Sequence, residues 1–372
     1  MKIDSVQAVT VAIPLQKPLS FSTRNVERRE WCLVRIRTDA GVDGWGYCYG
    51  GNRAAHLVTG FVRDLYRDHL LGRDPCAVEE LWDAMYRDAV LLGRRGAAVR
   101  ALSAVDIALW DIKAKAAGQP LYRALGGGFV ESVPCYASGG YYWRDKHPDT
   151  VADEVAAYVE AGFTAVKIKV GKPDHHAEVR RALKAREAIG PDTILMMDAN
   201  NAWPDAAAAV YAIRGLEESD PFWIEEPLMP DDIIGHAQVR AAVNVPIATG
   251  EIEATRWGFA SLLEHGAVDI LQPDSTVLGG VTEFRKVAAL ASAHSVPLYP
   301  HWLHHIHVSL VAAFPNAIMV EYFWDLSVLN INEIICDPIT AKAGQLTVPQ
   351  DPGIGINFDE TAVSRFAVDA WS

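Results

Sequence analysis

Cysteine is scarce in this 372-residue sequence, and the five cysteines present are odd in number and scattered along the chain. No two of them form a C-x-x-C pair. Without paired or clustered thiols, the sequence offers neither a disulfide framework nor a cysteine-based zinc site. We therefore expect reduced thiols and a cytoplasmic protein.

Basic runs and long apolar runs are missing as well. Acidic residues outnumber Lys and Arg by 47 to 34, giving a formal net charge of −13, and no basic stripe is present to displace counterions from phosphates. No apolar run reaches the length of a membrane span. The sequence thus argues against nucleic-acid and membrane partners, and a small anionic substrate would need locally concentrated positive charge.

Two nucleotide-binding signatures, G-x-G-x-x-G and G-x-x-x-x-G-K-[ST], are also absent. Their absence weakens the alternative prediction that the chain forms an open doubly wound sheet with a nucleotide site. What the sequence has, from about residue 133, is a regular alternation of short β-branched apolar runs with Ala-rich amphipathic stretches. The strand candidates are 133–138, 164–170, 193–199, 221–226, 245–251, 268–274, 296–301 and 317–323. Eight parallel β-α units predict a closed α/β barrel.

The two ends of the chain lack this alternation. Residues 1–125 contain three strand-like runs followed by helices, which predicts a separate α+β domain before a barrel at 126–335. The tail, 336–372, is expected to pack back on the first domain. Two segments of that domain, about 18–31 and 46–56, are candidate substrate lids. Their candidate substrate contacts are Arg24, Tyr47, Tyr49 and Arg53.

Ionisable side chains stand at the ends of successive predicted barrel strands, where such barrels carry their active sites. Lys167 and Lys169 are two residues apart, so both face the barrel mouth. The following strands end in Asp198, Glu225 with Glu226, Glu251, Asp274, His301 and Glu321. Single acidic residues often cap helices, but a series spaced by about one β-α unit indicates a common site.

Three of these carboxylates, Asp198, Glu225 and Glu251, come from adjacent strands and predict a metal site. A set of oxygen ligands favours Mg²⁺, or Mn²⁺, over zinc. Carboxylates packed this closely would raise one another's pKa unless a cation neutralised them. Glu226 is an alternative to Glu225, because neighbouring strand residues face opposite ways.

Asp274 and His301 end neighbouring strands, which suits a carboxylate that orients an imidazole. Lys169 and His301 lie on opposite sides of the mouth, with the carboxylates between them, as proton transfer at carbon requires. A zinc cluster of His301, His304, His305 and His307 is a competing interpretation. No acidic or cysteine ligand stands beside it, so the last three are expected to be helix or loop residues.

In its combination of motifs the sequence resembles the enolase superfamily, mandelate racemase subgroup. The motifs are "SAVDIALWDIKAKAAGQPLYRALGG", "KIK", "MDAN", "WIEEP", "GE", "QPD", "PHW" and "VEYF". The resemblance covers essentially the whole chain. It implies a modified TIM barrel, (β/α)₇β, with an N-terminal capping domain completed by the C-terminal tail, in a homo-oligomer of two to eight subunits.

The resemblance also implies roles for individual residues. One Mg²⁺ per subunit is bound by Asp198, Glu225 and Glu251, with the first Glu of "IEEP" as the ligand. Lys169 is the general base on one face of a small carboxylate substrate, and His301 with Asp274 serves the other face. Lys167 lies beside the substrate carboxylate, and Glu321 donates a hydrogen bond to it as a protonated acid. Asn200 contacts that carboxylate or the α-hydroxyl.

Removal of the proton α to a carboxylate creates an enediolate, which metal and ammonium groups stabilise. Lys169 must be neutral to act, and we expect burial, Lys167 and Mg²⁺ to lower its pKa. We favour dehydration of an aldonate or aldarate to a 2-keto-3-deoxy acid, with His301 protonating the leaving hydroxyl. Racemisation or epimerisation of a 2-hydroxy acid is the alternative, and a non-catalytic binding protein on the same scaffold is a third.

Overall fold

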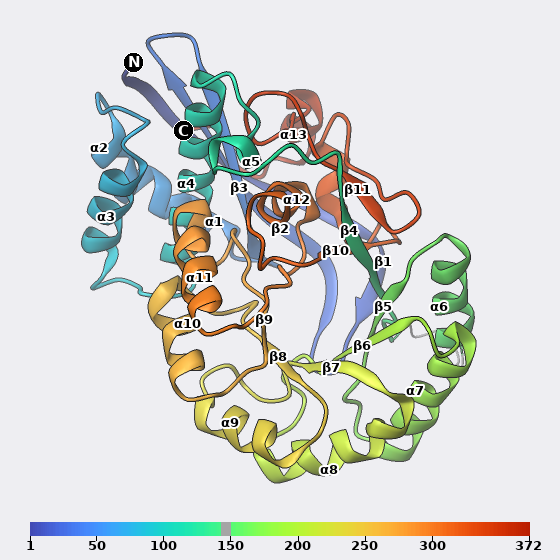
Figure 1. Cartoon of the computed structure of the whole chain (residues 1–372). Coiled ribbons are helices and arrows are strands. Elements are labelled where there is room, and N and C mark those ends of the chain that lie inside the picture. Colours follow the sequence, from blue (N-terminus) through green and yellow to red (C-terminus); the bar gives the residue numbers. More distant parts are fainter. Residues whose placement is uncertain (143–149) are drawn as a thin grey trace.

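The computed structural model describes residues 1–142 and 150–372, and its centre is a barrel of parallel strands (Figure 1). Hydrogen bonding orders the strands β10-β4-β5-β6-β7-β8-β9. Their bounds are β4 (Ser132–Gly139), β5 (Ala165–Lys169), β6 (Ile194–Asp198), β7 (Pro221–Glu225), β8 (Ile247–Thr249), β9 (Ile270–Leu271) and β10 (Val320–Phe323).

One predicted strand, 296–301, is not formed as a strand. Only Leu298 makes β-bridges there, to Leu271 on one side and Ala317 on the other. Pro297 and Pro300 flank it, and proline cannot donate to a strand ladder. The bridges of this single residue nevertheless join the end of the sheet back to its beginning, so the barrel is closed.

Helices surround the barrel (Figure 1). They are α6 (Thr150–Glu160), α7 (His175–Ile189), α8 (Ala206–Leu216), α9 (Ile233–Ala242), α10 (Thr255–Glu264), α11 (Gly280–Ala293) and α12 (His304–Ala313), with a 3₁₀ turn η2 (Glu217–Ser219) after α8. Asp174, Asp205 and Asp232 cap three of them by accepting a hydrogen bond from the backbone N–H three residues on.

The barrel interior has an apolar floor. One residue from each of β4 to β9, plus Tyr299, contributes to it: Tyr136, Ala165, Met196, Trp223, Ala248, Ile270 and Tyr299. Val166 and Ile168 of β5 instead join the large core that the surrounding helices complete. Since strand side chains alternate, Lys167 and Lys169 follow Ala165 on the inner face, above the floor.

The N-terminal part forms a three-stranded antiparallel sheet of β1 (Ile3–Ser20), β2 (Asn25–Thr38) and β3 (Asp43–Gly51). Its helices are α1 (Ala55–Phe61), the π-turn η1 (Val62–Tyr66), α2 (Arg67–Leu70), α3 (Val78–Ala89), α4 (Ala97–Ala116) and α5 (Leu121–Ala124). Helix α4 lies directly on β3 at Gly46, where an added Cβ would come within 1.9 Å of the Ala104 carbonyl oxygen. Glycine is therefore required at this crossing.

The C-terminal segment packs on this sheet, as expected, with 3₁₀ turn η3 (Asn330–Ile334) and helix α13 (Glu360–Phe366). The Val368 N–H donates to the Thr10 carbonyl oxygen (2.9 Å), and the Ala8 N–H donates to that of Ser372 (3.0 Å). The segment also reaches the barrel, because β11 (Gln345–Thr347) pairs antiparallel with β4. No helix of the described residues is long and apolar enough to cross a membrane.

The two candidate lids are more ordered than loops. Residues 18–31 are mostly strand, since β1 and β2 form a hairpin with a short turn at 21–24. Segment 46–56 is the second half of β3, a turn at 52–54 and the start of α1. Both turns lie where the N-terminal sheet meets the barrel mouth.

Candidate active site

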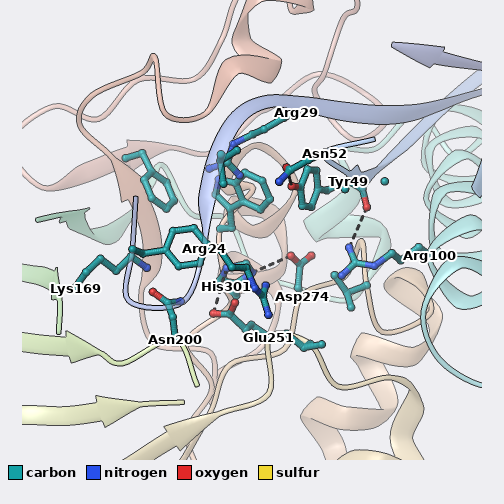
Figure 2. A pocket seen from close by; sticks show the side chains of 18 of the residues that line it. Arg24, Arg29, Tyr49, Asn52, Arg100, Lys169, Asn200, Glu251, Asp274 and His301 are labelled. Carbon is teal, nitrogen blue, oxygen red and sulfur yellow. Dashed lines mark hydrogen bonds and ion pairs between the residues drawn. The ribbon is translucent and has the colours of Figure 1, made fainter. Parts of the chain in front are cut away.

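A cavity of about 390 Å³ lies between the N-terminal sheet and the barrel mouth, within the size range of small-ligand sites. Figure 2 shows side chains entering it from both parts of the chain. The N-terminal part contributes Arg24, Arg29, Tyr49, Asn52 and Arg100, and the barrel contributes Lys169, Asn200, Glu251, Asp274 and His301.

The turn of the β1–β2 hairpin is attached to the loop after β6. The Ser22 hydroxyl donates to the Ala199 carbonyl oxygen (2.5 Å), and the Thr23 hydroxyl donates to that of Asn200 (3.1 Å). Asn200 has a positive φ of 48°, a conformation that asparagine tolerates better than most residues. The hairpin therefore closes one side of the cavity through a strained barrel loop.

The three predicted metal ligands lie together. One carboxylate oxygen from each of Asp198, Glu225 and Glu251 is within 4.8 Å of the other two. Burial and the Asp198 charge raise the pKa of Glu225 to about 8, despite the opposing charge of Lys167. Glu251 Oε2 is buried without a hydrogen-bond donor. His301 Nε2 lies 3.3 Å from this oxygen without meeting hydrogen-bond geometry. An oxygen-only cluster with a buried oxygen that accepts no hydrogen bond fits Mg²⁺.

Glu226 does not join this cluster. It follows the last residue of β7 with a positive φ of 45°, and its carboxylate is buried on the side of Asn201. Alternation along the strand separates it from Glu225. The geometry thus favours the first Glu of the pair as the ligand.

The two lysines are each paired with carboxylates. Lys167 Nζ lies 2.8 Å from Glu225 Oε2 and 2.7 Å from Glu321 Oε1, and it is fully buried. Lys169 Nζ pairs with Asp198 Oδ2. Lys169 lines the cavity, but Lys167 does not. The predicted place of Lys167 beside the substrate carboxylate is therefore not seen, because two glutamates already enclose its ammonium group.

The predicted lowering of the Lys169 pKa is also not seen. Burial is the largest single effect and lowers this pKa, but Asp198, Tyr141 and Glu321 together raise it by more, so the net shift is upward. Asp198 belongs to the carboxylate cluster as well. A cation held there would compete with Lys169 for the same carboxylate and so reduce the upward shift.

The pKa of Glu321 is also shifted in the direction opposite to the prediction. The resemblance implied a protonated carboxyl. Burial is the largest single effect and raises the pKa of Glu321, but Lys167, His301 and Lys169 together outweigh it and lower the pKa to about 2. Its Oε2 accepts a hydrogen bond from the Trp302 N–H (2.7 Å). In this structure Glu321 is an ionised partner of Lys167 that also fixes the chain just after His301.

His301 and Asp274 form the predicted pair. His301 Nδ1 lies 3.1 Å from Asp274 Oδ2, and Nε2 lies 3.3 Å from Glu251 Oε2. Burial is the largest single effect and lowers the pKa of His301, but Glu251, Asp274 and Glu321 together outweigh it and raise the pKa to about 9. The Thr276 N–H and hydroxyl both donate to Asp274 Oδ1 (2.8 Å), which holds the carboxylate in place.

The other three histidines belong to α12 and lie buried there, as expected. His307 Nδ1 lies 3.1 Å from the Trp302 carbonyl oxygen, and its Nε2 accepts from the Ser275 N–H (3.0 Å). Within the described residues, only the Asp198, Glu225 and Glu251 group has metal-site geometry. These histidines therefore do not form a second metal site, and His307 joins the chain after Asp274 to the chain after His301.

The candidate lid contacts divide into two groups. Arg24 and Tyr49 line the cavity, whereas Arg53 and Tyr47 are outside its lining. Tyr47 is fully buried against Phe358 of the C-terminal segment. Tyr49 is two residues, or roughly 6–7 Å, further along β3 and so reaches the cavity. The structure therefore places Tyr49, and not the predicted Tyr47, at the cavity.

Three cavity residues were not singled out from the sequence, although Arg29 lies in a candidate lid: Arg29, Arg100 and Trp302. Arg29 is in the middle of a hairpin strand and Arg100 is in α4. Neither element is part of the barrel pattern that identified the other residues. Trp302 follows His301 in "PHW", so only its neighbour pointed to the site.

Comparison with known proteins agrees with this geometry. Residues 3–126 match the "Mandelate racemase / muconate lactonizing enzyme, N-terminal domain" family, and residues 150–362 match "Enolase C-terminal domain-like". The chain belongs to the mandelate racemase group of the enolase superfamily. Its barrel and capping domain are those of this family.

Relatives of this family member span nearly its whole length. D-galactarolactone cycloisomerase of Agrobacterium fabrum is 34% identical over 98% of this chain and 99% of its own. L-talarate/galactarate dehydratase of Salmonella typhimurium is 34% identical over 97% and 90%. 3,6-anhydro-alpha-L-galactonate cycloisomerase of Streptomyces coelicolor is 36% identical over 98% and 99%. The chain is accordingly an enzyme of the lyase or isomerase class.

Solved structures of the family are similarly close. A racemase from Streptomyces coelicolor with bound magnesium has a TM-score of 0.92 at 34% identity, covering 98% of this chain and 100% of its own. The Salmonella typhimurium dehydratase, liganded with Mg and L-lyxarohydroxamate, has a TM-score of 0.91 at 32% identity, covering 100% and 94%. Magnesium in these structures agrees with the oxygen cluster found here.

Proposed function

We propose that this family member removes the proton α to the carboxylate of an acid sugar and then expels the β-hydroxyl as water. The observation that carries the proposal is the placement of Lys169 and His301. Lys169 enters the cavity from β5 and His301 from the segment that follows the Leu298 bridges, with the carboxylate cluster beside both (Figure 2). This arrangement provides a base, an acid and a cation site around one substrate carbon.

Asp198, Glu225 and Glu251 would hold the Mg²⁺, which when bound supplies positive charge for the substrate carboxylate and the developing enediolate. Lys169 becomes available as the base when Asp198 serves as a metal ligand instead of its ion-pair partner. Its Nζ then takes the proton from the α-carbon. Lys167 lies behind Glu225 and keeps that carboxylate oriented.

His301 acts as the acid. Its Nδ1 is held by Asp274, which leaves Nε2 facing the cavity beside Glu251. As the bond between the β-carbon and its oxygen breaks, the Nε2 proton passes to the departing hydroxyl, which leaves as water. The resulting enol becomes a 2-keto-3-deoxy acid by taking up a proton at carbon. The overall reaction neither oxidises nor reduces the enzyme.

A cycloisomerase is the second candidate, because two relatives carry that name. When the β-oxygen of the substrate belongs to a ring, the same elimination opens the ring instead of releasing water. Racemisation, with His301 returning a proton to the opposite face of the α-carbon, is the third outcome.

Incubation of the Mg²⁺-loaded enzyme with a panel of acid sugars in D₂O distinguishes these outcomes. We expect α-proton exchange together with formation of a keto acid, read by NMR and by semicarbazone absorbance. Exchange with inversion but no keto acid would instead establish a racemase. Failure to exchange any acid in the panel would contradict the proposal, and Asp198→Asn is the inactive control.

A further inference from the structure

Arg29 of β2 is a buried cation at the wall of the cavity. It is only 7% exposed, and its Nε has no hydrogen-bond partner. The centre of the guanidinium lies 4.3 Å from the Trp302 ring centroid and 5.7 Å from that of Tyr49. Of the described residues, no carboxylate forms an ion pair with it. Arginine stays protonated even when burial lowers its pKa.

Neighbouring arginines of the same sheet are paired. Arg28 lies 2.7 Å from Glu30 Oε1, and Arg35 lies 2.7 Å from Asp43 Oδ2. Burying a charge without a counter-ion is costly. Arg29 is therefore an exception that a bound anion would explain.

The position of Arg29 restricts which anion this would be. Figure 2 places Arg29 on the N-terminal sheet, across the cavity from Glu251 and Asn200 of the barrel. Arg100, whose Nη1 donates to the Tyr49 carbonyl oxygen (3.0 Å), and the exposed Arg24 line the same cavity. Burial raises the pKa of Tyr49 and all three arginines act to lower it, so positive charge gathers around this tyrosine of the N-terminal sheet.

We propose that Arg29 binds a second, distal carboxylate of the substrate, which makes the substrate a dicarboxylic sugar acid rather than a monoacid. This rests on the proposed function, because it takes the first carboxylate to lie at the Asp198, Glu225 and Glu251 cluster. Trp302 and Tyr49 contact the guanidinium as cation–π partners, and the Tyr141 side chain shares a hydrogen bond with it. All three partners are uncharged, so the guanidinium, including its unpaired Nε, remains available to a carboxylate. A hydroxymethyl group in the same place would leave the buried charge unpaired.

The test uses two inert acids, 2-hydroxyadipate and 2,6-dihydroxyhexanoate. Both have six carbons and an α-hydroxyl, neither has a β-hydroxyl to eliminate, and they differ only in the distal group. Binding to the Mg²⁺-loaded enzyme is measured by calorimetry for wild type, Arg29→Met and Arg37→Met. Arg37 is the control because it is on the same strand but contacts Gln7 outside the cavity.

We expect wild type and Arg37→Met to bind the diacid about tenfold or more tighter than the monoacid. Arg29→Met should reduce this ratio to about one while leaving the monoacid affinity unchanged. Equal affinities in wild type, or equal weakening of both acids by Arg29→Met, would overturn the proposal. If Arg29→Met does not fold, Arg29→Lys is measured instead. Lysine keeps the charge but lacks the planar guanidinium, so the ratio of diacid to monoacid affinity should be intermediate. An unaltered ratio in Arg29→Lys would contradict the role of Arg29.

Kinetics separates this proposal from the general function. If the enzyme binds the diacid more tightly but turns over no acid sugar, the distal carboxylate subsite is supported and the elimination reaction is excluded. If instead the enzyme eliminates water efficiently from aldonates, and Arg29→Met does not change that rate, the elimination reaction is supported and the distal carboxylate subsite is ruled out.

Discussion

At the scale of the residue, Asp198 has two functions that compete. It is one of three carboxylates that can hold a metal, and it is the ion-pair partner of Lys169. Because one carboxylate serves both cations, the protonation of Lys169 is coupled to occupancy of the metal site. The same logic applies to Glu225, which is shared between the cluster and Lys167.

Replacing Lys169 with methionine tests this coupling. We expect α-proton exchange to fall by roughly 10²–10⁴-fold through loss of the base. Mg²⁺ affinity should be unchanged or tighter, because a competing cation has been removed from Asp198. Calorimetric Mg²⁺ titration and exchange measured by NMR report the two effects. Lys113→Met, in α4 and outside the cavity, is the control, and full exchange by Lys169→Met would refute its assignment as the base.

His301 makes stability depend on pH in the metal-free enzyme. Its folded-state pKa of about 9 lies above the ordinary value of about 6.5. The extra stability of the protonated form is thus fully present below about pH 6.5 and is lost as the pH rises through 9. We expect the unfolding free energy of wild type, relative to His301→Asn, to fall by roughly 1–3 kcal/mol across this window. Urea denaturation in a chelator measures it, and a difference that grows with pH would contradict the assignment.

At the scale of the element, the site depends on loops that are tied to one another. The β1–β2 turn is held to the loop after β6, and His307 of α12 joins the loop after β9 to the segment after His301. These links set the relative positions of Asn200, Asp274 and His301.

Removing the hydroxyls of the hairpin turn should loosen the cavity without unfolding the chain. For Ser22→Ala with Thr23→Val, loss of two hydrogen bonds of about 1 kcal/mol each predicts a rise in KM of roughly 5- to 30-fold. The melting temperature should hardly change, since the turn is partly exposed. Steady-state kinetics and thermal denaturation check this, with Ser364→Ala of α13 as the control. An unaltered KM would show that the turn does not close the cavity.

His307→Leu should act on the site from a distance. It leaves the buried Ser275 N–H and Trp302 carbonyl without partners, which predicts a loss of about 1–3 kcal/mol in stability. We also expect kcat to fall, because Asp274 precedes Ser275 and His301 precedes Trp302. Denaturation and kinetics of His307→Leu and His307→Gln separate the two effects. A stable, fully active leucine variant would exclude the positioning role.

At the scale of the whole molecule, metal binding and folding are coupled. Three carboxylates held within 4.8 Å repel one another in the folded chain and separate on unfolding. Mg²⁺ at about 100 times its Kd should therefore stabilise the fold by about 2.7 kcal/mol, and Asp198→Asn should abolish this response. Calorimetric melting with and without Mg²⁺ measures it. Equal stabilisation of wild type and Asp198→Asn would place the metal elsewhere.

The sequence by itself determined the architecture and which ionisable side chains gather at the barrel mouth. The β-α alternation predicts a barrel, and strand geometry alone brings strand-end residues such as Asp198 and Glu251 to one mouth. The interior orientation of Lys167 and Lys169 follows from the two-residue repeat of a strand. These inferences depend on local periodicity, which can be read directly from the sequence.

Only the tertiary structure decided the ionisation states of the site residues and which residues of the N-terminal sheet line the cavity. Lys169 and Glu321 have pKa shifts opposite to those expected, because each has an oppositely charged partner from another strand, Asp198 and Lys167 respectively. Arg29 reaches the cavity only because its sheet packs across the barrel mouth. Charge pairing and burial depend on distances between segments far apart in the chain, and no local pattern encodes them.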